Sequence, residues 1–124
     1  MIDLIYFDTK WDADNHTTIM VMIDGKPVGT CMVDHCNKGE HKGQALLWNL
    51  QVQKRYRRKG IGYALLDKAI QCAEEKGCSE IRLVWRSVDS PEWVLRWYER
   101  KGFDECAFGN GIVEMRLVLK GGEE

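Results

Sequence analysis

Residues 45–85 constrain the fold most, because they read as a strand, a basic glycine-containing turn, a helix and a second strand. Ala45–Val52 is an apolar run of strand length. Apolar residues then recur at helical spacing from Ile61 to Lys76, and Gly77 suits a left-handed helix end. Glu80–Trp85 alternates like a strand. A helix that joins two strands of one sheet makes them parallel, so this segment predicts one parallel crossover. The predicted apolar face of the helix comprises Ile61, Ala64, Leu65, Ala69, Cys72 and Ala73.

The segment before this crossover predicts antiparallel strands. Three β-branched or apolar runs have strand length: Ile2–Phe7, Thr17–Ile23 and Val28–Val33. The dipeptide Asp24-Gly25 separates the last two runs, and it favours a tight hairpin because glycine accepts a positive φ. Asn37–Gly43 is polar and reads as a loop.

The segment after the crossover predicts a second helix and a last hairpin. Ser90 is the expected N-cap, Pro91 the first helical residue and Gly102 the stop. Phe103–Phe108 and Ile112–Leu119 flank a glycine-rich turn. The predicted order is β-β-β-β-α-β-α-β-β, a mixed α+β fold with a mostly antiparallel sheet, helices packed on its faces and one βαβ crossover.

Length and composition favour one domain, residues 1–124. No apolar stretch is long enough to span a bilayer and no leader is evident, so we expect a cytoplasmic protein that does not associate with membranes. A net charge of −1 argues against a nucleic-acid partner. Cys31, His35, Cys36 and His41 lack the paired spacing of a zinc knuckle. We therefore expect no metal, and thiols at all five cysteines.

The basic turn before Ile61 is the strongest functional signal. The first N–H groups of a helix lack internal partners, and the helix dipole is positive at that end. Gly60 and Gly62 leave room for a ligand to approach these groups closely. Basic residues crowd the rim of the turn: Lys54, Arg55, Arg57, Arg58 and Lys59. This arrangement predicts a diphosphate site, whereas the simpler interpretation is a solvated turn that keeps the chain soluble.

Around this turn and in a later segment, the sequence resembles the GNAT superfamily of acyl-CoA-dependent N-acyltransferases. The pyrophosphate loop of that family reads Arg/Gln-x-x-Gly-x-Gly/Ala, and Arg57-Arg58-Lys59-Gly60-Ile61-Gly62 matches it. Val52, Tyr56 and Arg57 match the approach Val-x-x-x-Tyr-Arg. Tyr98-Glu99-Arg100-Lys101-Gly102-Phe103 matches the later Tyr-Glu-x-x-Gly-Phe. The ordered pair of motifs is more specific than either motif alone.

The resemblance implies transfer of an acetyl group from acetyl-CoA to a primary amine by direct attack through a tetrahedral intermediate. It implies that the strand before the loop splays from the next parallel strand and that its backbone pairs with the pantetheine arm. An N–H at or beside Val52 would polarise the thioester carbonyl, and Tyr98 is the candidate general acid. On spacing alone Tyr98 is a core aromatic. The implied cofactor-binding residues are Leu50, Gln51, Val52, Arg57, Arg58, Lys59, Gly60, Ile61, Gly62 and Tyr63.

The chain departs from the family pattern in several places. Pro91 and Val94 replace the usual Asn and Ala, so the cofactor contact of that Asn is expected to be missing or to be supplied by Ser87 or Ser90. Residues 8–16 are too short for the family's first two helices, which normally wall the acceptor cleft. An open cleft suits a protein or peptide amine as well as a small molecule, and a second subunit, as in a homodimer, is another way to complete it.

The general base is left unassigned. No carboxylate lies on the strand before the loop, and Glu40, His41, Asp89 and Glu92 all remain candidates, as does a water chain. Trp48, Trp85, Trp93 and Trp97 are expected near the cleft, with at least two in the core.

Two other functions are open at this stage. One is a CoA-binding regulatory module without turnover, which the missing base and the altered Pro91 allow. The other, a nucleic-acid binder that uses the basic turn, predicts strongly salt-dependent binding to any polyanion.

Overall fold

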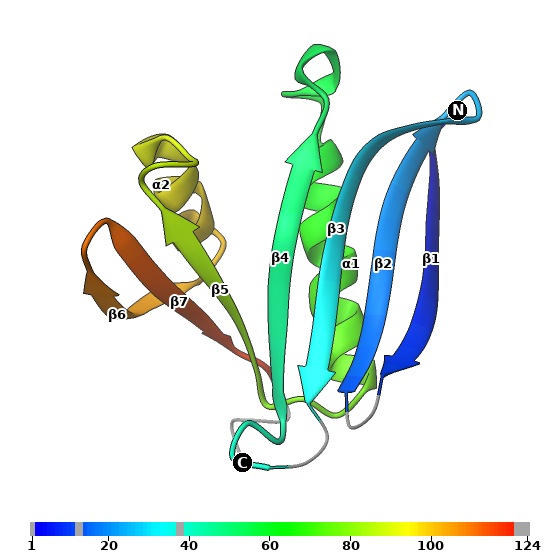
Figure 1. Ribbon diagram of the computed structural model, residues 1–124. Coiled ribbons are helices and arrows are strands. Elements are labelled where there is room, and N and C mark those ends of the chain that lie inside the picture. Colours follow the sequence, from blue (N-terminus) through cyan, green and yellow to red (C-terminus); the bar gives the residue numbers. More distant parts are fainter. Residues whose placement is uncertain (1, 12–13, 37–38, 121–124) are drawn as a thin grey trace.

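A computed structural model describes residues 2–11, 14–36 and 39–120, with side chains from His16 onward (Figure 1). The described residues form one mixed sheet with two α-helices and a short 3₁₀ helix. The elements are β1 (Ile2–Trp11), β2 (Asp14–Ile23), β3 (Lys26–Cys36), β4 (Gln44–Val52), η1 (Lys54–Tyr56), α1 (Ile61–Glu75), β5 (Glu80–Arg86), α2 (Glu92–Arg100), β6 (Asp104–Gly109) and β7 (Ile112–Val118).

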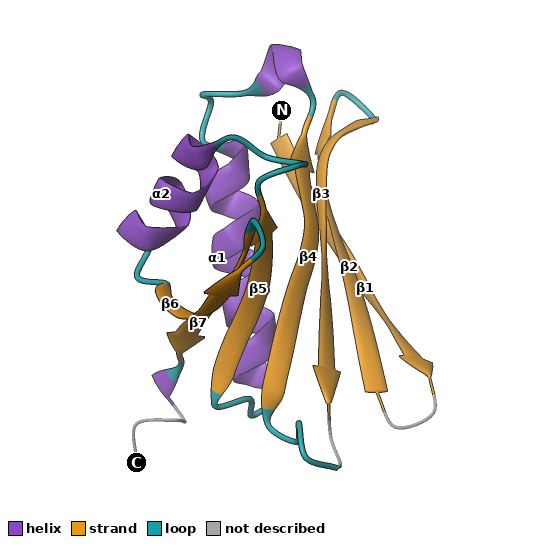
Figure 2. Cartoon of the chain, turned by 60° about the vertical axis from the view of Figure 1, so that its left-hand side comes forward, coloured by secondary structure: helices purple, strands orange, loops and turns teal. Residues whose placement is uncertain are grey.

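The sheet has the predicted mixed topology. Its strand order is β1-β2-β3-β4-β5-β7-β6. The neighbouring strands are antiparallel except for β4 and β5, which are parallel and joined through α1. The expected order of strands and helices and the single crossover are therefore confirmed. Figure 2 shows α1 and α2 on the same side of the sheet.

The first strands are longer than the sequence predicted. β1 continues to Trp11 and β2 begins at Asp14, so only residues 12 and 13 separate them. Two residues are too few for a helix, which confirms that the family's first helical pair is absent here. The hairpin between β2 and β3 turns at Asp24 (φ 50°) and Gly25 (φ 77°). Positive φ at both central residues is the type I′ turn that Asp-Gly favours.

Helix α1 covers one face of the sheet and forms the core with it. Its buried residues are Ile61, Leu65, Leu66, Ala69, Cys72 and Ala73. The prediction that Ala64 belongs to this face is wrong, because Ala64 is exposed and Leu66 is buried. With a rotation of about 100° per residue, the centre of the buried face lies between Leu65 and Ala69 around the helix axis. Ala64 points away from that face. The opposing strand residues include Ile19, Val21, Cys31, Val33, Ala45 and Leu47.

Helix α2 begins one residue later than predicted. Pro91 is its N-cap, with extended ψ (157°) and no side-chain capping bond. The expected Ser90 cap is therefore wrong: the extended ψ of Pro91 keeps it outside the helix. The helix ends at Arg100, and Gly102 (φ 103°) reverses the chain as predicted. None of the helices in the described ranges combines the length and the apolarity needed to cross a bilayer.

Candidate functional site

The parallel strands β4 and β5 separate soon after they begin. Their register contains only the pairs Gln44–Glu80, Ala45–Ile81 and Leu46–Arg82. Beyond Leu46 the two strands diverge, as Figure 1 shows. A cavity of about 400 Å³ lies between them. Its lining residues are Leu47, Trp48, Asn49, Leu50, Gln51, Leu83, Val84, Trp85, Arg86, Asp89, Ser90, Val94 and Tyr98.

A bulge bends β4 beside this cavity. The register with β3 shifts between the pairs Thr30–Gln51 and Met32–Trp48, so two residues of β4 oppose Cys31 alone. Asn49 takes the left-handed conformation (φ 55°) in that bulge. An extra residue of this kind increases local twist and bends the strand. The bulge thus turns the last residues of β4 away from the plane shared with β5.

The polar groups of Val52 point into the gap and not toward β3. Val52 faces Gly29 on β3, and the next N–H, of Gln53, donates to the carbonyl of Val28 (2.8 Å). In an antiparallel ladder this makes Gly29–Val52 a pair without mutual hydrogen bonds, so the N–H and C=O of Val52 face the opposite side. The side-chain N–H of Arg57 donates to the Val52 carbonyl from that side (3.1 Å). The Val52 N–H is left facing the opening.

The turn after β4 presents a series of backbone N–H groups. Arg58 (φ 64°) and Gly60 (φ 79°) are both left-handed, and Gly60 is the N-cap of α1 without a side-chain cap. The first helical bond runs from the N–H of Ala64 to the carbonyl of Gly60 (3.0 Å). Within the described part of the chain, no backbone carbonyl accepts from the N–H groups of residues 58–63. Such a run suits an anion.

The predicted binding residues lie on one continuous stretch, from the end of β4 to the first turn of α1. Leu50 and Gln51 line the cavity. The side chains of Arg57, Arg58 and Lys59 are exposed at the turn. Ile61 is buried in the core, so only its backbone is available, while Tyr63 is half exposed. Of this set, only Leu50 and Gln51 belong to the cavity lining, and the other residues continue the chain from the end of β4 into α1.

Tyr98 reaches the cavity from α2 and is 8% exposed. Its ring packs edge-on against Trp97 (5.1 Å between centroids) and Phe103 (5.7 Å). Burial, with a smaller contribution from Cys31, raises the pKa of the Tyr98 phenol. The phenol is protonated at neutral pH, as a tyrosine of ordinary pKa also is, so Tyr98 has a proton to donate to a departing anion. Tyr98 is therefore a buried aromatic, as its spacing predicted, and it also lines the cavity.

The tryptophans do not form the expected cluster. Trp48 and Trp85 border the cavity, whereas Trp93 is 62% exposed and is not part of its lining. Trp97 lies against the first turn of α1, where a Cβ on Gly62 would meet its ring at 3.7 Å. Trp85 and Trp97 are partly buried and pack against the core, so two of the four contribute to core packing without being fully buried.

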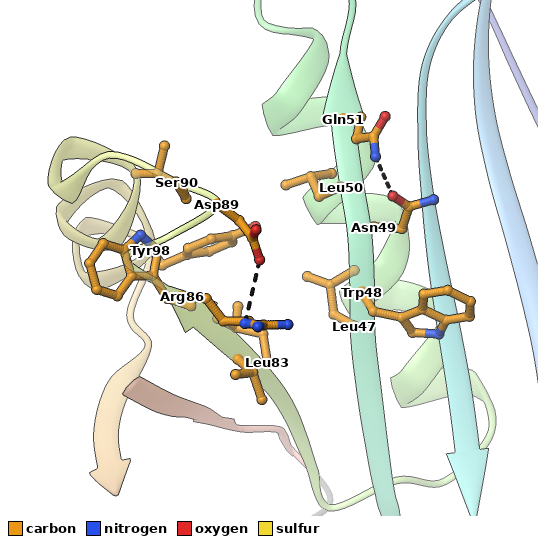
Figure 3. Close-up of a pocket in the computed structure, with 13 residues that line it drawn as sticks. Leu47, Trp48, Asn49, Leu50, Gln51, Leu83, Arg86, Asp89, Ser90 and Tyr98 are labelled. Atoms are coloured by element: carbon orange, nitrogen blue, oxygen red, sulfur yellow. Dashed lines mark hydrogen bonds and ion pairs between the residues drawn. The ribbon is translucent and has the colours of Figure 1, made fainter. Parts of the chain in front are cut away.

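The structure places two charged groups in the cavity, of which the sequence analysis had not singled out Arg86. Arg86 and Asp89 line the cavity and form an ion pair (Nε to Oδ2, 3.4 Å; Figure 3). Asp89 was one of several open candidates, and no local pattern distinguished it from Glu92. Ser90 also lines the cavity, whereas Ser87 does not. Ser90 is therefore better placed than Ser87 for the role expected of the missing Asn.

A second polar cluster lies on the sheet face opposite α1. His16 contacts Asp34 (Nδ1 to Oδ1, 2.5 Å), and its Nε2 lies 2.9 Å from the hydroxyl of Thr18. The indole N–H of Trp48 donates to the other oxygen of Asp34 (2.9 Å). Figure 3 shows Trp48 turned toward β3 and away from the cavity. This cluster is therefore separate from the opening between β4 and β5.

These features define a class of α+β proteins in which one βαβ crossover joins two parallel strands that diverge after a few residues. The chain belongs to the acetyltransferase (GNAT) family, whose sequence profile matches residues 2–103. It is 30% identical over 89% of its length to an uncharacterised N-acetyltransferase of Methanocaldococcus jannaschii, of which it covers 49%. It is 32% identical over 92% of its length to N-alpha-acetyltransferase 30 of Xenopus laevis, covering 42% of that protein.

A solved structure has the same fold. The PaiA N-acetyltransferase of Thermoplasma acidophilum, in complex with coenzyme A, superposes with a TM-score of 0.71 at 21% identity, over 82% of this chain and 59% of that one. The chain spans about half the length of the two relatives named above.

Proposed function

We propose that this chain transfers an acetyl group from acetyl-CoA to a primary amine, and that residues 1–124 act as one catalytic domain. The observation that carries the proposal is the early parting of β4 from β5, which opens a cavity beside unpaired backbone groups and a protonated phenol. Membership of an acetyltransferase family and the coenzyme A bound to a protein of the same fold support it.

Acetyl-CoA fits the site in two parts. The pyrophosphate lies against the N–H groups of residues 58–63, since the N–H of Arg57 donates to the Lys54 carbonyl, and the side chains of Arg57, Arg58 and Lys59 add positive charge at the rim. The pantetheine arm follows β4 past Leu50 and Gln51 and pairs with the backbone of Leu50 and Val52, because the backbone of Gln51 pairs with Thr30 of β3. That strand edge is available because β5 has already diverged.

The chemistry then occurs at the open end of β4. The Val52 N–H donates to the thioester oxygen and stabilises the negative charge that develops on it. The amine nitrogen attacks the carbonyl carbon, and the C–S bond of the tetrahedral intermediate breaks. Tyr98 gives its proton to the sulfur, which leaves as a neutral thiol. No cysteine is needed, and the Cys31 thiol is buried with a pKa raised by desolvation to about 12.

Substitution of Tyr98 by Phe tests the acid role. The change removes one hydroxyl and keeps the ring contacts with Trp97 and Phe103. We expect kcat to fall by about 10²-fold or more while the dissociation constant for CoA is unchanged. Thiol release from acetyl-CoA measures turnover with a panel of amines, made of small amines and unblocked peptides. Calorimetry measures CoA binding.

Tyr56→Phe is the matched control, because Tyr56 is a half-buried tyrosine that does not line the cavity. It should retain full activity. Equal kcat in the Tyr98→Phe variant and the unmodified chain would remove Tyr98 from the mechanism. Stabilisation by CoA without thiol release for any amine would favour a binding module over an enzyme.

A further inference from the structure

The cavity between β4 and β5 contains one acidic side chain. Among the described residues that line it, Asp89 is the only carboxylate, and β4 contributes no titratable group to the lining. The groups that face Asp89 are Arg86 of β5 and Tyr98 of α2 (Figure 3). An amine enters such a cavity as an ammonium ion, which is attracted to a carboxylate and must lose a proton before it can attack.

We propose that Asp89 binds the ammonium group of the acceptor and accepts its proton. This assignment rests on the acetyl transfer proposed above. It supplies the general base that the sequence left open.

Position excludes two of the other candidates. Glu40 and His41 precede β4 and lie, paired at 3.1 Å, on an exposed turn. β4 is nine residues long, so its two ends are about 26 Å apart at ~3.3 Å per residue. The N–H of Val52, where the thioester is polarised, lies at the far end from this turn.

Two other carboxylates, Glu92 and Asp34, do not line the cavity. Glu92 contacts Arg96 one helical turn away (3.7 Å) and does not line the cavity. Both oxygens of Asp34 are occupied, one by His16 and the other by the indole of Trp48. Asp34 also belongs to β3, which pairs with the edge of β4 opposite to the one that faces β5. Neither group is placed to meet an amine between β4 and β5.

Hydrogen bonds fix the backbone of Asp89, whereas its side chain forms only a weak ion pair. Its N–H and that of Ser90 both donate to the carbonyl of Arg86 (3.1 and 3.0 Å), which fixes the turn between β5 and α2. Its side chain is 64% exposed and that of Arg86 57%, at a separation of 3.4 Å. An exposed ion pair of this kind is weak, so an arriving ammonium can displace Arg86 without a large penalty.

The protons and electron pairs balance. Asp89 accepts one proton from the ammonium and releases it to water. The nitrogen lone pair forms the C–N bond, and the sulfur takes the electron pair of the breaking C–S bond and a proton from Tyr98. The second proton, lost from nitrogen as the amide forms, returns to Tyr98. The net reaction releases one proton to solvent for each amide made.

The experiment compares Asp89→Asn with Glu92→Gln, an exposed carboxylate three residues away. Thiol release is followed from pH 6.5 to 9.5 with the fastest acceptor of the amine panel. We expect Asp89→Asn to lower kcat/KM by about 10²-fold at pH 7, with a deficit that shrinks as the pH passes the acceptor's own pKa, near ~8 for an α-amine. CoA affinity should change by less than about twofold, and Glu92→Gln should match the unmodified chain.

Several results would overturn the assignment. Activity of Asp89→Asn within about threefold of the unmodified chain at pH 7 would exclude Asp89 as the base. So would a deficit of equal size at every pH, since that indicates a merely structural effect, or an equal loss in Glu92→Gln. If the unmodified chain binds CoA but acetylates no amine, the proposed function fails and the role of Asp89 fails with it. Normal turnover that is insensitive to Asp89→Asn refutes the role of Asp89 alone.

Discussion

Replacing Gly60 by Ala tests whether the conformation of the basic turn, and not only its charge, makes the site. Gly60 is the N-cap of α1 with φ 79° and ψ 5°, a left-handed conformation. A Cβ there would meet no heavy atom within 4 Å, so the cost is conformational and not steric. Alanine in this region costs about 1–2 kcal/mol, part of which is offset by lower entropy of the unfolded chain. We expect a net loss of about 1 kcal/mol in the free energy of unfolding.

Gly62→Ala is the matched control in the same turn. Gly62 lies inside α1, and an added Cβ would meet Trp97 and Val52 only at ordinary distances of 3.7 to 4.0 Å. Alanine favours the helix over glycine by up to ~1 kcal/mol, so this variant should be as stable as the unmodified chain or more so. The two substitutions add the same methyl group and are predicted to have opposite effects on stability.

CoA binding should separate the two variants further. If Gly60→Ala shifts the turn enough to lose one N–H bond to a phosphate, worth about 1.5–3 kcal/mol, the CoA dissociation constant rises at least tenfold. Urea unfolding followed by tryptophan fluorescence gives the stability, and calorimetry gives the affinity. The reasoning is wrong if Gly60→Ala is as stable as Gly62→Ala, or if both bind CoA like the unmodified chain.

The remaining predictions concern groups whose pKa is raised by burial. Burial raises the pKa of the Cys31 thiol to about 12, and this thiol donates to the Leu65 carbonyl. It should therefore stay unmodified by a thiol reagent at pH 8 in the folded chain, whereas the exposed Cys106 should react at once. Rapid modification of Cys31 before unfolding would contradict its burial. The raised pKa of Tyr98 means that above pH ~10 the unfolded chain loses this proton while the folded chain retains it. Its contribution should therefore lower the free energy of unfolding by up to about 1.4 kcal/mol per pH unit in that range, a slope that Tyr98→Phe should lack in pH-dependent urea unfolding. Equal slopes in the two proteins would show that the Tyr98 phenol ionises freely when folded.

Much of the fold follows from patterns that involve few neighbouring residues. Asp24-Gly25 specifies a type I′ hairpin because both residues tolerate positive φ. The spacing of apolar residues after Ile61 predicts α1 within one residue of its observed end. The same local logic misplaced Ala64 and Ser90, where the packing of a helix against the sheet and the extended ψ of Pro91 decided the outcome.

The cavity depends on contacts that no local pattern contains. The Gly60–Gly62 turn and the Tyr98 motif are readable from the sequence, but their meeting across the opening depends on where β4 leaves β5. Pairing with β5 ends at Leu46, and the bulge at the left-handed Asn49 then bends the rest of β4; no pattern in the run Ala45–Val52 predicts that bulge. The selection of Asp89 over Glu92 likewise needs the turn after β5 to face β4.

The sequence by itself therefore determined the order of elements, the single crossover and the identity of the glycine turn, because φ preferences and apolar periodicity act over a few residues. Only the tertiary structure decided which polar groups share the opening between β4 and β5. The reason is that strand register and sheet twist place segments some forty residues apart in sequence, such as Leu50 and Asp89, on the same cavity wall.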